Sequence, residues 1–143
     1  MMGSFDIKLV MLSVNLLFVT LLEAYPESHV TIIGRVEKGT LTIHCYSGDN
    51  DLGIRNLAYD RSFEFSFVPN ILGNTKFFCT FTTQFGSGNY AVYDHKMETE
   101  RCGLNCVWYI EEKGPCLVLN PEKNLWCQPW KNPGKWLHET HQN

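Results

Sequence analysis

The residues of this sequence best suited to chemistry are its six cysteines, Cys45, Cys79, Cys102, Cys106, Cys116 and Cys127. A nucleophilic cysteine needs a neighbouring base and an accessible thiolate, and His44 directly precedes Cys45. Adjacent residues of a strand point to opposite faces, so the His44 ring cannot readily reach the Cys45 sulfur. The pair therefore favours a structural cysteine beside a surface histidine.

Two segments invite a metal-site interpretation, and neither fits well. Three residues separate Cys102 from Cys106 but ten separate Cys116 from Cys127, whereas structural zinc sites use short gaps in both pairs. Residues 49–53, Asp-Asn-Asp-Leu-Gly, look like part of a calcium loop but lack the third oxygen ligand before the glycine. A polar turn explains them better. We expect no metal and no cofactor.

Motifs of the common enzyme classes are also missing from the sequence. It contains no G-x-S-x-G motif, no phosphate-binding P-loop and no dinucleotide fingerprint. These observations predict that the protein is not an enzyme. A secreted enzyme whose site is assembled only in three dimensions stays an alternative.

The N-terminal segment has the pattern of a signal peptide. Residues 9–22 form a mostly apolar run, which is shorter than the roughly 20 residues that a membrane-spanning helix needs. Lys8 precedes the run, and Glu23 and the small residue Ala24 follow it, with Ala24 just before the expected cleavage point. We predict a signal peptide over residues 1–24, a domain over residues 25–143, and a secreted, extracellular protein. A buried N-terminal helix is the alternative.

Export and charge together narrow the class of protein. Oxidising compartments favour disulfides, so an even number of cysteines with irregular spacing predicts a disulfide framework. The net charge of −3 argues against a nucleic-acid binder, and it also weakens a defence or toxin-like role on membranes, although that alternative stays open. No second apolar run approaches membrane-spanning length, so we expect no stable membrane insertion.

Apolar and polar residues alternate with period two through most of the remaining chain. Phe63, Phe65 and Phe67, separated by Ser, Glu and Ser, are the clearest example of a half-buried strand. Strict alternation argues against parallel sheets, whose strands are apolar on both faces. We predict an all-β fold, a small disulfide-stabilised antiparallel β-sandwich of about eight short strands. The expected strands lie within residues 30–32, 41–45, 63–67, 77–81, 90–94, 106–110, 116–119 and 125–130.

The same alternation orients the cysteines. Cys45, Cys79 and Cys106 share a face with large apolar residues, so their thiols should point into the core, where a disulfide could join one sheet to the other. Cys116 and Cys127 lie on the two arms of the last expected hairpin and could be bridged across it. This pairing is a hypothesis, because the sequence leaves other pairings of the six cysteines open.

Several motifs in order resemble one known family. They are His44-Cys45-Tyr46-Ser47 followed by residues 49–53, the aromatic strand 63–67, the segment 75–81, and the C-terminal cysteines with Val107-Trp108, Gly114-Pro115 and Gln128-Pro129-Trp130. This order is similar to that of plant self-incompatibility S-proteins and their homologues, over residues 30–131. The resemblance implies a secreted, non-enzymatic β-sandwich that acts as an extracellular ligand for a cell-surface receptor protein.

Recognition surfaces are commonly loops on a rigid scaffold, and three polar segments are candidates: residues 47–56, 84–89 and 94–103. Their charged side chains offer mixed signs, which favour specificity. Leu52 should anchor the first loop against the core. The candidate recognition residues are Asp49, Asp51, Arg55, His95, Lys96, Glu98, Glu100 and Arg101.

Overall fold

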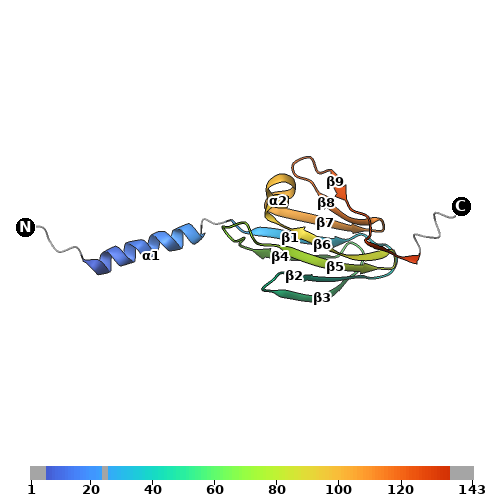
Figure 1. The fold of residues 1–143 in the computed structure, drawn as a ribbon, viewed down its shortest axis with the longest axis horizontal. Coiled ribbons are helices and arrows are strands. Elements are labelled where there is room, and N and C mark those ends of the chain that lie inside the picture. Colours follow the sequence, from blue (N-terminus) through green and yellow to red (C-terminus); the bar gives the residue numbers. More distant parts are fainter. Residues whose placement is uncertain (1–5, 24–25, 136–143) are drawn as a thin grey trace, which may run out of the picture.

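The computed structural model describes residues 6–23 and 26–135, and it contains two five-stranded sheets packed face to face (Figure 1). One sheet has the order β4-β1-β7-β8-β9 and the other the order β10-β6-β5-β2-β3. The all-β sandwich expected from the alternation is therefore confirmed. The strands are β1 Ser28–Gly34, β2 Leu41–Tyr46, β3 Asp51–Leu57, β4 Ser62–Phe67, β5 Phe77–Thr83, β6 Gly86–Tyr93, β7 Asn105–Glu111, β8 Gly114–Val118, β9 Leu125–Cys127 and β10 Asn132–Pro133.

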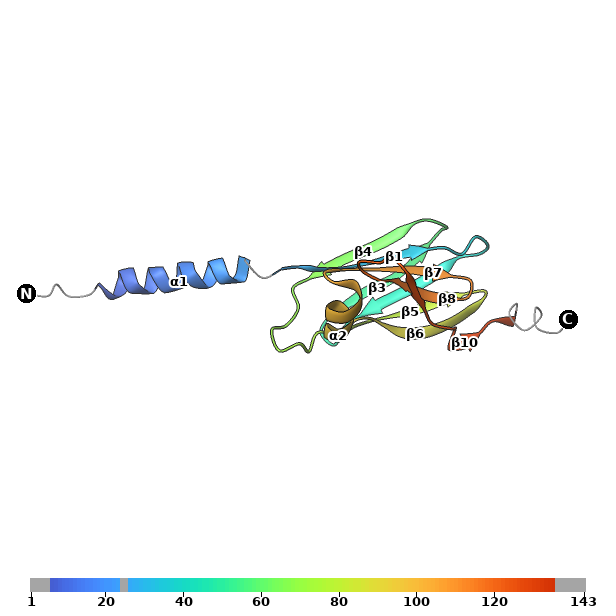
Figure 2. The same ribbon diagram turned by 90° about the horizontal axis from the view of Figure 1, so that it is seen from above.

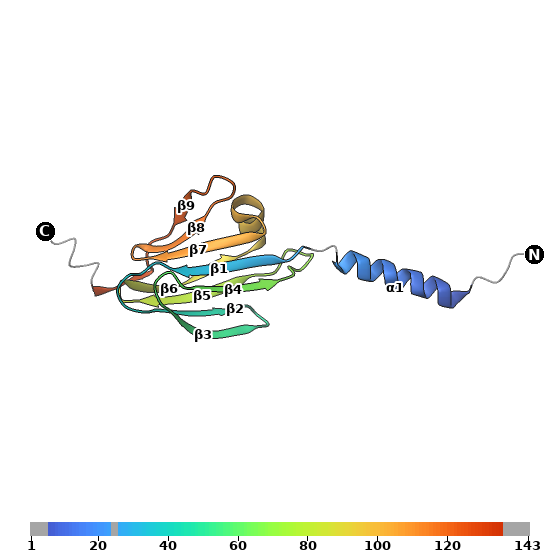
Figure 3. The ribbon, with the colours of Figure 1, turned by 180° about the vertical axis from the view of Figure 1, so that it is seen from behind.

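The N-terminal apolar run forms helix α1, Ile7–Glu23, which extends away from the sandwich in Figures 1 and 3. Its apolar side chains are exposed; Ile7 is 75% and Leu16 65% accessible. None of the helices in the described ranges is both long and apolar enough to cross a membrane. The expected cleavage point after Ala24 lies outside the described residues.

One pair of neighbouring strands corrects the expectation of a purely antiparallel sandwich. Strand β1 pairs in parallel with β7, with Val30 opposite Cys106 and Ile32 opposite Trp108. Between these strands the chain passes through the other sheet, so no short connection forces them to be antiparallel. Both strands still have one buried face, and their alternation therefore does not distinguish the two directions.

The core lies between the two sheets and is dominated by aromatic rings. Trp108 of β7 is fully buried, and its indole Nε1 donates to the carbonyl oxygen of Val92 on β6 at 3.0 Å, so it joins the two sheets. The half-buried ring of Phe67 packs 4.4 Å from Phe77 and 4.6 Å from Tyr93, measured between ring centroids. The alternation of Phe63, Phe65 and Phe67 is confirmed as a half-buried edge strand, β4.

Three disulfides bind neighbouring segments of this scaffold. Cys116 and Cys127 face each other across β8 and β9, which confirms the bridge predicted for the last hairpin. Cys102 is bonded to Cys106 at the start of β7. Cys45 pairs with Cys79, directly opposite on β2 and β5 with 4.0 Å between their Cα atoms.

The pairing of Cys45 corrects the expectation that its disulfide could join one sheet to the other. Both cysteines do point into the core and are fully buried. A directly opposite residue on a neighbouring strand is about 5 Å away, however, whereas facing sheets are about 10 Å apart. The nearest thiol available to Cys45 is therefore in its own sheet.

Two of the three expected loops are shorter than predicted, and the third contains helical turns. Asp51 and Arg55 lie on β3, an edge strand with exposed residues on both faces, so the alternation that would reveal a strand is missing. Only residues 84 and 85 separate β5 from β6, because Gly86 starts β6 and leaves room for the Trp130 ring. Residues 95–102 form the helical turn α2, His95–Met97, and the π-helical turn η1, Glu98–Cys102.

Candidate functional site

Four connections between strands lie together at the end of the sandwich nearest α1 in Figures 1 and 2, and we call this end the loop end. The connections are residues 47–50, 68–76, 94–104 and 119–124. A shallow depression of about 390 Å³ is lined by residues of the first two. Gly73 lies against the His95 ring, and the Asn120 amide donates to the Arg101 carbonyl oxygen at 2.7 Å. Residues distant in the sequence therefore form one surface here.

The charged segment 94–103 is held in a defined conformation. Asp94 is the N-cap of α2, and its carboxylate accepts a hydrogen bond from the Met97 amide at 2.7 Å. Met97 and Cys102 are buried beneath it, and the Cys102–Cys106 disulfide ties its end to β7. His95, Lys96 and Glu100 remain exposed on the outside of this turn.

Glu98 is an exception among the predicted recognition residues. The buried hydroxyl of Tyr93 donates to the Glu98 carboxylate. Burial, first of all, and this carboxylate raise the pKa of Tyr93 well above its usual value, so the hydroxyl keeps its proton. Glu98 therefore fastens η1 to the sandwich, and its carboxylate is not a free charge.

Asp51 is also used inside the protein. Its carboxylate accepts from the Gly53 amide at 2.8 Å and lies 2.7 Å from the His44 ring nitrogen. The Gly53 hydrogen bond and then the one with His44 hold the pKa of Asp51 below its usual value. Leu52 is half-buried against the core, as expected from the sequence.

Arg55 and Asp49 occupy different places, although the sequence suggested one loop for both. The Arg55 guanidinium lies 4.3 Å from the centroid of the Phe63 ring and so connects the edges of the two sheets. Asp49 is exposed in the turn between β2 and β3 and belongs to the loop end. The 84–85 turn lies at the opposite end, where β6 starts, so the three expected segments do not form one surface.

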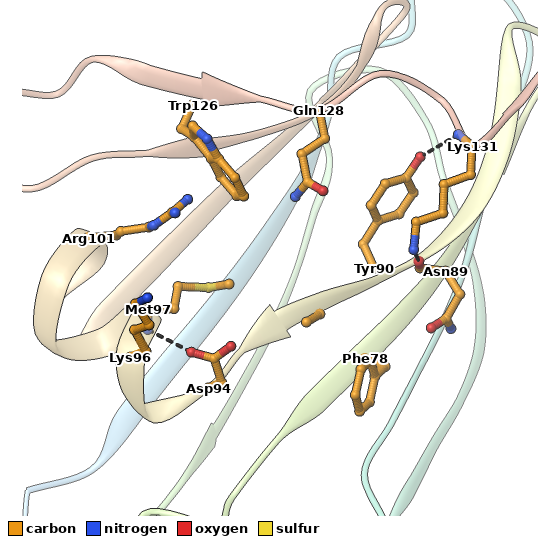
Figure 4. Close-up of a pocket in the computed structure, with 11 residues that line it drawn as sticks. Phe78, Asn89, Tyr90, Asp94, Lys96, Met97, Arg101, Trp126, Gln128 and Lys131 are labelled. Atoms are coloured by element: carbon orange, nitrogen blue, oxygen red, sulfur yellow. Dashed lines mark hydrogen bonds between the residues drawn. The ribbon is translucent and has the colours of Figure 1, made fainter.

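A second feature runs from the loop end along the side of the sandwich. It is a groove of about 400 Å³ between β6 and β9, and Figure 4 shows the residues that line it. Lys96 and Arg101 border the groove at the loop end and Lys131 borders it further along β6. The Arg101 guanidinium stacks 3.8 Å from the centroid of the Trp126 ring.

Sequence reasoning missed several residues of both surfaces. Trp126, Tyr90 and Lys131 come together only because β9 is the edge of one sheet and β6, which β10 covers only at its start, faces it from the other sheet. No local pattern reveals this arrangement. Ile71 and Leu72 protrude from the β4–β5 connection, each 75% exposed. Their signal was available, since an apolar pair between Pro69-Asn70 and Gly73-Asn74 is unusual for a solvated turn.

The described residues do not offer a metal centre. Within residues 6–23 and 26–135, no group of three or more His, Cys, Asp or Glu side chains is arranged to hold an ion. The four cysteines considered as zinc ligands are instead paired as two disulfides. What the two surfaces can offer a ligand is apolar contact, hydrogen bonds and charge.

Comparison with known proteins identifies relatives of this chain. It is 39% identical to S-protein homolog 3 of Arabidopsis thaliana over 107 residues, 71% of each chain. It is 34% identical to S-protein homolog 18 of the same plant over 129 residues, 89% of this chain and 94% of the relative.

A solved structure has a similar fold. It is a self-incompatibility protein homologue described as one of a widespread family of small, highly stable, secreted plant proteins. The match has a TM-score of 0.56 at 15% identity and covers 75% of this chain and 94% of that one. The sequence profile of the family described as "Plant self-incompatibility protein S1" matches residues 29–130, almost the range expected from the motifs. The chain belongs to this family of S-protein homologues.

Proposed function

We propose that this protein is a secreted, non-enzymatic recognition protein, which binds a receptor protein on the surface of plant cells. Residues 1–24 act as a signal peptide in this proposal, and the sandwich is released. Its family membership, the description of the related structure as a secreted protein, and the N-terminal apolar run support the proposal.

The observation that carries the proposal is the exposed apolar group at the loop end. Ile71 and Leu72 are each 75% exposed and Val68 is 54% exposed. The charged turn 94–103 adjoins them, since Gly73 lies against His95. An apolar centre with a charged rim is the usual anatomy of a protein–protein interface.

The scaffold beneath the loop end favours specific binding. The Cys102–Cys106 disulfide and the Asp94 cap fix the charged turn, and the Cys45–Cys79 disulfide fixes the strands next to the β2–β3 turn. A surface ordered before binding loses less conformational entropy when the complex forms. The loop end can therefore contribute affinity from a small number of side chains.

A matched pair of substitutions tests this site. Ile71→Ser and Ile54→Ser remove the same side chain from positions that are 75% and 70% exposed, one at the loop end and one in the middle of β3. Labelled protein, secreted from cells that express the full chain, is titrated onto intact plant cells. We expect Ile71→Ser to weaken binding about tenfold or more, as for a central interface residue, and Ile54→Ser to leave it unchanged. Equal effects of the two substitutions would contradict the site.

Secretion has its own test. We expect the protein recovered from the medium to begin at Tyr25, as measured by mass spectrometry of the intact chain. Protein that stays inside the cells, or that keeps residues 1–24, would contradict the signal peptide.

A further inference from the structure

The groove between β6 and β9 is bordered by strand edges on both sides. Strand β9 is the last strand of its sheet, and β6 is covered by β10 only at Gly86 and Ser87. Beyond Ser87, no strand among the described residues pairs with this edge of β6. Figure 4 shows the open space between β6 and the segment that carries Trp126 and Gln128. Two carbonyl oxygens of this part of β6 already have side-chain partners, the Lys131 ammonium at Asn89 and the Trp108 indole at Val92. The short stretch between them is the part of the edge that can accept an additional strand through backbone hydrogen bonds.

The charges along the groove are mainly positive. Lys96, Arg101 and Lys131 line it, against one carboxylate, Asp94, which already accepts the Met97 amide hydrogen bond. Two of the cations are held in place: Arg101 stacks on Trp126, and the Lys131 ammonium lies 4.7 Å from the centroid of the Tyr90 ring. The protein as a whole is acidic, so this local excess of positive charge is not explained by composition.

The Lys131 ammonium also contacts the backbone of β6 directly. It donates to the backbone carbonyl oxygen of Asn89 on β6, while the Lys131 amide donates to the Tyr90 hydroxyl at 2.8 Å. The Tyr90 hydroxyl in turn donates to the Pro129 carbonyl oxygen at 2.9 Å. The C-terminal segment is thereby fixed where it leaves the groove, and Lys131 stands at the point where the uncovered edge begins.

We infer that this groove binds an extended acidic peptide segment, which pairs with the short stretch of the β6 edge between Asn89 and Val92 and places carboxylates beside Lys131 at one end and beside Lys96 and Arg101 at the other. The inference rests on the proposed function, because the segment belongs to the receptor. The loop end and the groove would then contact the same partner.

The distance between the two cationic ends of the groove sets the spacing of the acidic residues. Asn89 and Asp94 are five residues apart, which corresponds to about 16 Å of extended chain. Side chains of a strand alternate between two faces, so two residues on the same face are separated by an even number. A separation of four residues, about 13 Å, is the best match to the two cationic ends of the groove.

An acidic polysaccharide would use the same charges but fits the geometry less well. Sugars stack their rings on open aromatic faces, whereas one face of Trp126 is already covered by Arg101 at 3.8 Å. Uncovered strand edges, in contrast, offer amide and carbonyl groups at the spacing of a peptide backbone.

The test uses fluorescent nine-residue peptides of Ser, Thr and Val with two glutamates, and the full chain secreted and oxidised. Fluorescence anisotropy compares glutamates four residues apart with glutamates three apart, with a peptide that has proline at its centre, and with two lysines in place of the glutamates. We expect the first peptide to bind best. The central proline should raise its Kd about tenfold, because proline has no amide hydrogen to donate to the neighbouring strand. The lysine peptide should not bind.

Matched variants locate the binding. Arg101→Gln and Lys131→Gln should each raise the Kd of the best peptide about tenfold, as expected for loss of a charge-assisted hydrogen bond. Lys38→Gln removes the same charge from an exposed turn at the other end of the sandwich and should change nothing. Thermal unfolding of each variant checks that it is folded.

Three results would overturn the inference: no difference between the proline peptide and its parent, equal effects of Lys38→Gln and Lys131→Gln, or tighter binding of an oligogalacturonate of equal charge. The proposed function is tested separately. Ile71→Ser could weaken saturable binding to cells while neither groove variant alters it. That result would support the proposed receptor binding and exclude the groove as the contact with the receptor.

Discussion

At the scale of single residues, Asp51 illustrates how a charged side chain in a recognition-like motif can serve the backbone instead. Its carboxylate accepts a hydrogen bond from the Gly53 amide and pairs with the ring of His44, on the neighbouring strand of the β2–β3 hairpin. Asp49, two residues earlier, is exposed and belongs to the loop end. The two aspartates look equivalent in the sequence, and only the register of β2 with β3 separates their roles.

The lowered pKa of Asp51 gives a stability that depends on pH. Because the pKa is below its ordinary value of 3.8 in the folded protein, the ionised carboxylate stabilises the fold above pH 3.8. This contribution is lost as the pH falls through the lowered pKa. We expect Asp51→Asn to reduce Tm at about pH 6 and to reduce it less as the pH is lowered towards about 2.

The control is Asp49→Asn, which removes the same charge from the same turn without touching His44 or Gly53. It should leave Tm unchanged at both pH values. A reduction in Tm by Asp51→Asn that is equally large in acid would mean that packing, rather than ionisation, accounts for the effect.

At the scale of elements, the sequence predicts strands well where one face is buried and poorly where neither is. The alternating burial of Phe63, Phe65 and Phe67 is visible as a pattern of residue types, and β4 follows from it. Strand β3 is exposed on both faces and β10 has only two residues, so neither leaves a periodic signal. The groove depends on how strand edges from facing sheets align, which is a property of topology and is not encoded locally.

The first residue of β8, Gly114, gives a prediction about how the elements pack. Gly114 has a φ of 138°, and a Cβ added there would lie 2.0 Å from the carbonyl oxygen of Gln128. We expect Gly114→Ala to lower the free energy of unfolding by about 3 kcal/mol or more, because backbone must move. Urea unfolding measures this value.

Gly48→Ala is the matched control for this substitution. A Cβ at Gly48 meets no atom within 4 Å, so its free energy of unfolding should change by less than about 0.5 kcal/mol. Similar free energies of unfolding for the two variants would contradict the close contact between Gly114 and the Gln128 backbone.

The three disulfides should stabilise the fold in the order of the chain lengths that they close. The sequence separations are 34 for Cys45–Cys79, 11 for Cys116–Cys127 and 4 for Cys102–Cys106. Chain entropy then predicts that the free energy of unfolding falls by about 4, 3 and 2 kcal/mol, in that order, when each pair is replaced by alanine. Urea unfolding of the three double variants gives the order, and the largest loss for Cys102–Cys106 would contradict it.

At the scale of the whole molecule, the sandwich separates two tasks. Its core and disulfides fix the strands, while one end and one side carry the exposed apolar and positive groups. The fold class follows from the alternation of apolar and polar residues and the family from the order of motifs, and both are confirmed. Which side chains share a surface is decided by the sheet order, and the secreted receptor-binding role remains our proposal.

The measurement that tests this role most directly is binding of the oxidised, labelled protein to intact plant cells before and after mild protease treatment of the cell surface. We predict saturable binding that unlabelled protein displaces and that protease treatment abolishes, since the partner that we propose is a surface protein. Binding that rises linearly with concentration, or that survives removal of the surface proteins, would contradict the account.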